Sequence, residues 1–382
     1  MNRQLNMEDS LDKIFKPEIK SATRAHKSCI SSISVNSDKT LVATSSGDGS
    51  IAVYVYLADK KQLKFKYRLC GHTLGVNCVA FHPNFPHLLA SCSDDMTVKI
   101  WDISKECSAD SINPTATSTS VSLVSDATHT FNTSHSDYVI NVQWCSIRDY
   151  RLFSCSADDT IVMYDMQNNT IGQTFRGHLS TPTFAQTVQR GHSNPAVDII
   201  MSTSLDGTIR FWDPLTGSLL KTAACSKAQS EILKDIELAP IASAILAPNH
   251  RFLLTYCLDK RIRLWKVADL LPSESAKANC CRVYDVPINT PYITSLAWGD
   301  LEKGDKKYRP FVMGCSDGKI LIGDLANANN TMIIDHYSAI KHTTKSPILA
   351  VATGIKNVIL TGDSTVDLNN TIGSFVNLWC FE

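Results

Sequence analysis

The sequence has no long apolar run. Its longest apolar runs, such as residues 51–57, have the length of a β-strand, whereas a membrane span needs about 20 residues. The opening residues, MNRQLNMEDSLDKIFKPEIK, contain no apolar core of the signal-peptide type. We therefore expect a protein that neither spans a membrane nor is secreted.

The sequence also lacks a net charge. Lys plus Arg and Asp plus Glu both number 37, so no overall field favours nucleic acid or a membrane surface. With 43% hydrophobic and 19% charged residues, the 382-residue chain has the composition of an ordinary globular protein. We expect no sequence-specific binding to nucleic acid and no membrane partner, and we look for partners in local patches.

Paired cysteine motifs are missing as well. The chain has 13 cysteines, an odd number, and none forms a CxxC pair. Cys92 and Cys155 each stand between two serines in a strand pattern, which favours a role as small apolar fillers. This usage predicts free thiols in a reducing compartment rather than a disulfide framework or a metal site.

Motifs for chemistry are absent too. The chain has no phosphate-binding glycine loop, no HExxH, no nucleophile elbow and no spaced His/Cys cluster. We therefore predict a protein that is not an enzyme and that holds no cofactor or metal.

A spaced pattern of four residues is present instead. His72 stands 23 residues before Asp95, Ser91 four before it and Trp101 six after it. A closely similar spacing recurs along the chain and gives seven copies, of which the last two are degraded. The residues of the other copies are His26, Thr44, Asp48 and Tyr54; His135, Ser154, Asp158 and Tyr164; His178, Ser202, Asp206 and Trp212; Thr255, Asp259 and Trp265; Asp317, with Gly323 in the aromatic position; and Trp379.

The copies predict the fold. Each contains alternating, β-branched segments separated by turn residues, as in a small antiparallel sheet. Such a sheet is apolar on both faces and must pack against its neighbours around an axis. We predict an all-β, seven-bladed β-propeller over residues 14–382, after a disordered tail over 1–13. Residues 14–24 are expected to supply the outer strand that the last blade lacks after Trp379.

Polar insertions interrupt the repeats over about 104–132, 226–240, 270–280 and 363–374. Each is either a contact site or a tolerated insertion. The basic residues 301–309 have two interpretations as well, a site for an acidic partner or a solvated loop.

The Gly-His at 71–72, the turn aspartate at 95 and the Trp-Asp at 101–102 resemble the WD-repeat propellers. The resemblance covers about residues 20–382 and implies that the four patterned residues of a copy form a buried, hydrogen-bonded relay. A structural relay is our interpretation, and catalysis by the His72 and Asp95 pair is the alternative. The relay residues are His72, Ser91, Asp95, Trp101, His135, Asp158, His178, Asp206 and Trp212.

Within that family, three stretches are similar to the branch that contains the Swd-three and WDR-five subunits of COMPASS histone methyltransferases. They are GHTLGVNCVAF with SCSDDMTVKIWD, SLDGTIRFWDPLTGSLLKT and LAPNHRFLLTYCLDKRIRLWK. The insertion at 226–240 is similar to one in the fungal members. The resemblance implies a non-catalytic nuclear scaffold of the complex that methylates lysine four of histone H-three. Its partners would be a SET-domain methyltransferase, a second WD-repeat subunit and a histone tail peptide.

The resemblance also implies two binding surfaces. In the animal members the mouth of the central channel holds an arginine between two phenylalanines, but Ile140 and Ser295 occupy those positions here. The mouth residues are Asn77, Asp94, Tyr138, Ile140, Tyr292 and Ser295. The second surface, beside the fifth blade, comprises Asn249, Phe252 and Leu264. In the alternative interpretation Phe252 and Leu264 are ordinary strand residues.

Three classes of function therefore stay open. The first is a scaffold of a histone methyltransferase, the second an adaptor in another assembly such as a ubiquitin ligase or an RNA-processing complex, and the third an enzyme built on a propeller. Identification of the partners separates the first two, and convergent catalytic groups outside the repeated turns would mark the third.

Overall fold

The computed structural model describes most of the chain. The described residues are 11–104, 123–124, 126–190, 197–225, 238–272, 280–286, 295–325, 331–335, 347–363, 365–366 and 372–381. Most of the four predicted insertions lies outside these residues. No helix within the described residues has the length and apolar character needed to cross a membrane.

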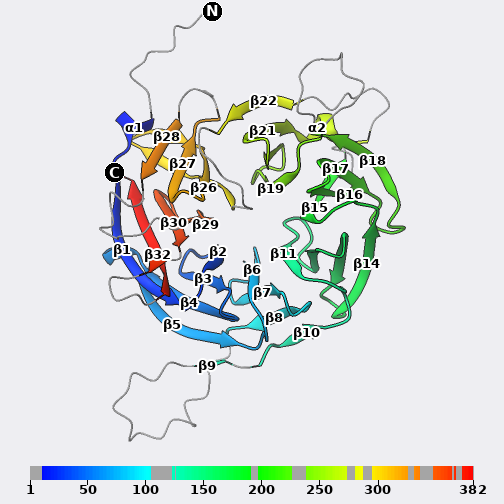
Figure 1. Ribbon diagram of the computed structural model, residues 1–382, viewed down its shortest axis with the longest axis horizontal. Coiled ribbons are helices and arrows are strands. Elements are labelled where there is room, and N and C mark those ends of the chain that lie inside the picture. The colour runs from blue at the N-terminus through cyan, green and yellow to red at the C-terminus, as the bar shows by residue number, and fades with distance from the viewer. Residues whose placement is uncertain are drawn as a thin grey trace, which may run out of the picture.

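The described strands form seven blades around an axis, which confirms the predicted all-β propeller (Figure 1). Each blade is an antiparallel sheet whose four strands follow one another outward from the axis. The third strand of a blade is the one that carries the repeated aromatic residue, as Trp101 does in the second blade. The repeat in the sequence is therefore a repeat of one structural unit.

The first four blades take their strands in chain order. Their strands are β2 (Ile30–Val35), β3 (Leu41–Ser46), β4 (Ser50–Leu57) and β5 (Gln62–Cys70); β6 (Val76–Phe81), β7 (Leu88–Ser93), β8 (Val98–Asp102) and β10 (His129–Phe131); β11 (Val139–Trp144), β12 (Arg151–Ser156), β13 (Thr160–Asp165) and β14 (Thr170–Arg176); and β15 (Pro182–Arg190), β16 (Val197–Ser204), β17 (Thr208–Trp212) and β18 (Leu219–Ala224). A 3-10 turn, η1 (Ala58–Lys60), joins β4 to β5, and β9 (Leu123–Val124) adds in parallel to the end of β5.

The fifth and sixth blades also take their strands in chain order, whereas the outer strand of the seventh comes from the N-terminal part of the chain. Their strands are β19 (Ile241–Leu246), β20 (Phe252–Cys257), β21 (Arg261–Lys266) and β22 (Cys280–Asp285); β23 (Leu296–Trp298), β26 (Phe311–Gly314), β27 (Lys319–Gly323) and β28 (Thr331–Asp335); and β29 (Ile348–Ala352), β30 (Val358–Asp363), β32 (Ile372–Phe381) and β1 (Pro17–His26). The short helix α2 (Val267–Leu270) follows β21, and β31 (Thr365–Val366) pairs with β32.

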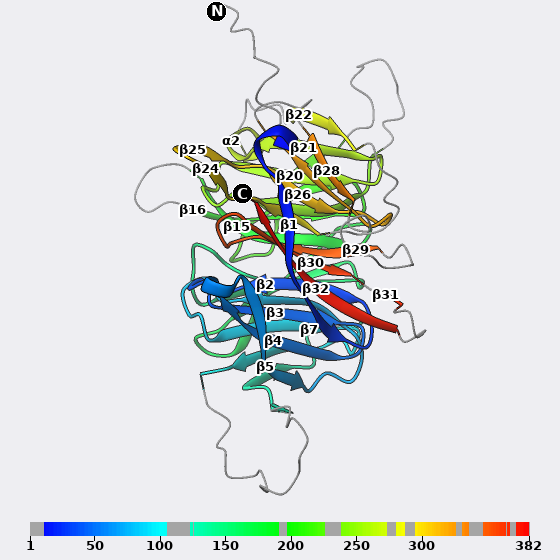
Figure 2. The ribbon, with the colours of Figure 1, turned by 90° about the vertical axis from the view of Figure 1, so that its left-hand side faces the viewer.

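The predicted closure of the ring by an N-terminal strand is confirmed. β1 pairs antiparallel with β32, from Pro17 opposite Phe381 to His26 opposite Ser374. Figure 2 shows β1 running alongside β32 on one side of the ring. The pairing gives β32 a partner on each side, because β30 lies on its other edge.

The boundary of the predicted tail differs from the structure. The tail was expected over 1–13, but helix α1 (Leu11–Ile14) begins within it, and Leu11 and Phe15 are buried. The Phe15 ring packs edge-on against Tyr308, with ring centroids 5.3 Å apart, and against Phe381. Residues 1–10 of the tail lie outside the described residues.

The basic residues 301–309 are more ordered than a solvated loop. They include the hairpin of β24 (Leu301–Lys303) and β25 (Lys306–Tyr308), and Leu301 is buried. Tyr308 in this hairpin is one of the two rings that hold Phe15. The hairpin therefore helps to anchor the N-terminal segment, while its lysines stay at the surface.

The second strand of each early blade is buried on both faces. In β7 every residue after Leu88 is buried, and the sequence LLASCS places small side chains where neighbouring blades approach closely. The described cysteines are all free, and most are buried, as expected for apolar fillers. Burial raises the pKa of Cys315 to about 12, so this thiol stays protonated at neutral pH.

Candidate protein-binding surfaces

The four patterned residues of the second blade meet in one cluster. His72 Nδ1 lies 2.8 Å from a carboxylate oxygen of Asp95, and His72 Nε2 lies 2.7 Å from Ser91 Oγ. The indole of Trp101 donates to the same Ser91 oxygen at 2.9 Å. Asp95 also accepts hydrogen bonds from Thr97 and from the backbone N–H of Thr73. The cluster ties together β7, β8, the turn between them and the loop that precedes β6.

Three other blades repeat this cluster. The distances from the histidine to the turn aspartate are 3.2 Å for His26 and Asp48, 3.1 Å for His135 and Asp158, and 2.9 Å for His178 and Asp206. In the fourth blade Trp212 donates to Ser202, and in the third blade the Tyr164 hydroxyl takes the place of an indole beside Ser154. The side chains of all four histidines are at most 1% exposed and lie inside the blades.

The turn aspartates have unusual acidity. Burial alone would raise the pKa of Asp95, but the hydrogen bonds from His72 and Thr97 and the charge of His72 outweigh it and hold this pKa well below its usual 3.8. The pKa values of Asp48, Asp158 and Asp206 are lowered for the same reasons. Burial lowers the pKa of His72 below 6.5 despite its bond to Asp95.

We expect these groups to make the fold sensitive to acid. In the unfolded chain, His72 binds a proton below about pH 6.5 and the turn aspartates bind protons below about pH 4. In the folded protein the lowered pKa values of these groups delay protonation to lower pH. Stability should therefore decrease slowly as pH falls below 6.5 and steeply below 4. Urea midpoints at pH 7, 5.5, 4 and 3 check this expectation. A midpoint that rises or stays constant across this series would contradict the lowered pKa values.

In the blades that lack the repeated histidine, other side chains pair with the aspartate or fill the space of the missing aromatic ring. In the fifth blade the Arg263 guanidinium binds Asp259 through two contacts, one of them 3.0 Å long, and the arginine is only 4% exposed. In the sixth blade the ring of Phe311 fills the space beside Gly323 where the repeated aromatic is missing. In the seventh blade Asp363 accepts a bond of 3.0 Å from Asn377.

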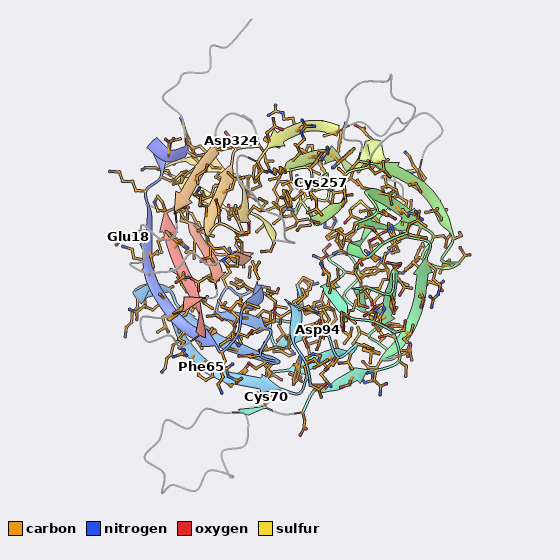
Figure 3. The ribbon with its side chains drawn as sticks, viewed as in Figure 1. Glu18, Phe65, Cys70, Asp94, Cys257 and Asp324 are labelled. Carbon is orange, nitrogen blue, oxygen red and sulfur yellow. The ribbon has the colours of Figure 1, made fainter. Side chains whose placement is uncertain are left out.

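The predicted channel-mouth residues are only partly free to bind. Asn77 donates to Asp94 at 2.7 Å and to the backbone oxygen of Val139 at 3.0 Å, so it links the second and third blades. Figure 3 places Asp94 on the inner side of the ring. The second carboxylate oxygen of Asp94 accepts no bond from any described residue, and Tyr138 is 51% exposed.

The two positions of the missing phenylalanines are occupied by packed residues. Ile140 packs against the core of the third blade. The Ser295 hydroxyl bonds to the backbone of Val351 in the neighbouring blade. Tyr292 lies outside the described residues. The described part of the mouth therefore offers one exposed aromatic ring and one carboxylate, and no aromatic sandwich.

Sequence reasoning missed the apolar residues around the mouth. Four exposed apolar side chains stand in the loops that carry the relay histidines and aspartates; they are Leu74, Met96, Leu179 and Leu258. Leu179, which directly follows His178, is 83% exposed. Their position one or two residues from the repeated His or Asp was the available signal. With Tyr138, these residues give the second to fifth blades an apolar loop face.

The fifth-blade surface borders a hollow of about 710 Å³. The hollow is lined by Phe252, Asn249 and Lys266 of the fifth blade and by Ile147 and Val188 of the preceding blades. Phe252 is half-buried and Asn249 is exposed. Leu264 is only 8% exposed and packs in the core, so of the predicted pair only Phe252 is available as an apolar contact.

The comparisons with known proteins agree with this fold. The family model described as "WD domain, G-beta repeat" matches residues 18–54, 63–102 and 170–213. These parts of the chain are similar to WD-repeat proteins, and the structure shows a seven-bladed β-propeller.

Three curated proteins are similar to part of the chain. A nuclear distribution protein PAC1 of Arthroderma benhamiae is 27% identical over 207 residues, which are 53% of this chain and 38% of that protein. A ribosome biogenesis protein WDR12 homolog of Anopheles gambiae is 28% identical over 202 residues, 52% of this chain and 44% of that protein. A striatin homolog of Dictyostelium discoideum is 26% identical over 215 residues, 53% of this chain and 24% of that protein. The chain thus matches less than half the length of each of these relatives.

Proposed function

We propose that this propeller is a non-catalytic scaffold that binds protein partners at the channel mouth and at the fifth-blade hollow. The proposal rests on how side chains are distributed between the buried relay and the exposed surface. Four histidines and their turn aspartates are held in the buried relay, whereas exposed apolar and polar side chains stand on the loops and beside the hollow. Such surfaces bind proteins through a few apolar anchors with polar neighbours.

We further propose that the assembly is a COMPASS-type complex that methylates lysine four of histone H-three. The support is the similarity of three stretches of the sequence to that branch of WD-repeat proteins, together with the accessible Phe252 and Asn249 beside the fifth blade. The partners would be a SET-domain methyltransferase and a second WD-repeat subunit, in the nucleus.

Binding at the channel mouth would differ from arginine capture in the animal members. A guanidinium stacked between two rings gains from cation–π attraction on both faces. Among the described residues of the mouth, a basic peptide, such as a histone tail, would meet the exposed Tyr138 ring and the second carboxylate oxygen of Asp94. We therefore assign the tighter contact to the fifth-blade hollow.

An adaptor of another nuclear assembly is the second candidate. The similarity to a ribosome biogenesis protein favours an RNA-processing complex as that assembly. Both candidates use the same surfaces, so only the identity of the partners distinguishes them.

Purification of tagged protein from its native cell tests the proposal. We expect a SET-domain methyltransferase and a second WD-repeat protein in stoichiometric amounts. Phe252→Ala should weaken the second of these interactions by about 1 to 3 kcal/mol, because it removes an apolar anchor from the hollow. Leu41→Ala, at the same position of the second strand in the first blade, is the matched control. Recovery of ribosome-assembly factors or a ubiquitin ligase would replace the methyltransferase assignment, and unchanged binding by the Phe252 variant would remove the hollow as a site.

A further inference from the structure

A second apolar hollow, of about 510 Å³, lies between the second and third blades. Its lining residues include residues of β8 and β10 in the second blade and of β11 in the third. Figure 1 shows these two blades side by side in the ring. The floor consists of the buried side chains of Trp144, Ile100 and His82. The walls are accessible side chains, namely Phe85, Leu88, His129, Tyr150 and Met166. The volume suits one or two side chains of a ligand.

Phe85 is held in place at the edge of this hollow. The buried imidazole of His82 accepts hydrogen bonds at Nδ1 from the backbone N–H groups of Asn84 and Phe85, both at 3.0 Å. Because Nδ1 accepts, the proton is on Nε2, which donates to the backbone oxygen of Asp149 in the third blade at 2.8 Å. The Asn84 side chain donates to the Asp149 carboxylate at 2.5 Å. The turn is therefore fixed from both blades.

This rigidity gives Phe85 the properties of a binding anchor. Its ring is 45% exposed, although it lies only 4.7 Å from the His82 ring, centroid to centroid. A single exposed apolar residue on a mobile turn needs no explanation. An exposed aromatic ring that is already ordered, beside an apolar hollow, loses little side-chain entropy when a ligand covers it.

The charges around the hollow select the ligand. No lysine or arginine is among the described residues that line it, whereas the exposed carboxylate of Asp149 stands at its rim. Asp165 directly precedes the wall residue Met166 and is ionised at neutral pH, because hydrogen bonds from Asn168 and Gln167 lower its pKa. The two arginines that flank Asp149 and Tyr150 in the sequence, Arg148 and Arg151, both pair with Asp198 at 2.9 Å. The Lys99 ammonium, next to Ile100 in the sequence, donates to the Thr130 hydroxyl. The rim therefore attracts positive charge.

We propose that the hollow between the second and third blades binds a short segment of a partner protein, which inserts one large apolar side chain next to a lysine or arginine. The apolar side chain would contact Phe85, Tyr150 and Met166, and the basic residue would face Asp149. This surface is separate from the channel mouth and the fifth-blade hollow. Its test therefore does not depend on the proposed function.

A random ten-residue peptide library displayed on phage is the probe. Sequences are selected on the unaltered protein and depleted on a Phe85→Ala variant, and the strongest is synthesised with a fluorescent label for anisotropy. We expect the selected sequences to place a large apolar residue within about two positions of Lys or Arg. Phe85→Ala should then raise the Kd about tenfold or more. Asp149→Asn, which keeps the acceptor for Asn84, should raise it severalfold, with less effect at high salt.

Leu215→Ala is the matched control, because Leu215 is 85% exposed in a turn of the fourth blade and lines none of these surfaces. It should leave the Kd unchanged. Thermal unfolding of Phe85→Ala separates lost binding from lost folding. Three results would overturn the proposal: no Phe85-dependent sequences, acidic sequences in place of basic ones, or peptide binding that strengthens tenfold when residues 106–121 are deleted, which would assign the hollow to the chain's own insertion.

Discussion

Removal of residues 11–26 is expected to leave a chain that does not form a closed ring and that aggregates on expression. The deletion takes β1 from β32 over eight paired positions and uncovers the buried Trp379 and Phe381. It also removes the buried Phe15. At about 3 kcal/mol or more for each of these three large rings, the combined loss is comparable to the roughly 5–15 kcal/mol by which a typical domain is stable.

Size-exclusion chromatography and thermal unfolding measure this effect. A variant that lacks only residues 1–10 is the control, because it keeps Leu11, Phe15 and the whole of β1. Co-expression of residues 11–27 as a separate peptide should restore part of the soluble protein. A soluble monomer with an unchanged unfolding temperature after removal of 11–26 would show that β1 does not close the ring.

Asp95→Ala is expected to lower the free energy of unfolding by about 3 to 5 kcal/mol. The aspartate accepts bonds from the His72 ring, the Thr97 hydroxyl and two backbone N–H groups, and its removal leaves these buried donors unpaired. Urea unfolding at pH 7 gives the value. Asp285→Ala breaks an exposed ion pair with Arg261 and serves as control, with an expected loss of at most about 1 kcal/mol.

The result for Asp95 distinguishes the two interpretations of the relay. A structural role predicts a large loss of stability. An Asp95 variant as stable as the Asp285 variant would show that the buried hydrogen bonds contribute little and would reopen the question of chemistry at this pair.

Much of the fold could be predicted because each blade repeats the side chains that hold its own strands and loops together. The spacing of His72, Ser91, Asp95 and Trp101 predicts a cluster, since buried His and Asp require partners. The closure by β1 followed from a missing outer strand next to Trp379. The first inference depends on residues near one another in the sequence, and the second depends on a count of strands.

The substitutions inside the pattern could not be predicted in the same way. Asp259 pairs with Arg263 of β21 instead of with a histidine. The ring of Phe311, on the neighbouring strand, fills the space of the aromatic residue missing at Gly323. In each case the compensating residue fits because of its position in space. A pattern read along the chain identifies the gap but not the side chain that fills it.

The candidate surfaces were predicted less well than the fold. Burial excludes Leu264 as a contact although its place in the sequence matches that of a contact residue. The hollow beside Phe85 combines a turn of the second blade with Asp149, more than 60 residues away, and neither belongs to the repeated pattern. Surfaces between blades depend on contacts that no single repeat contains.

The partnership of β1 with β32 also affects how the protein is made. About 345 residues lie between the two strands, so a ribosome working at about 5–20 residues per second needs roughly 20 to 70 seconds to release the second after the first. During this time β1 has no strand to pair with, and the ring of blades is not closed. We expect newly made chains to be prone to association through these unpaired strand edges until β32 has been made and pairs with β1.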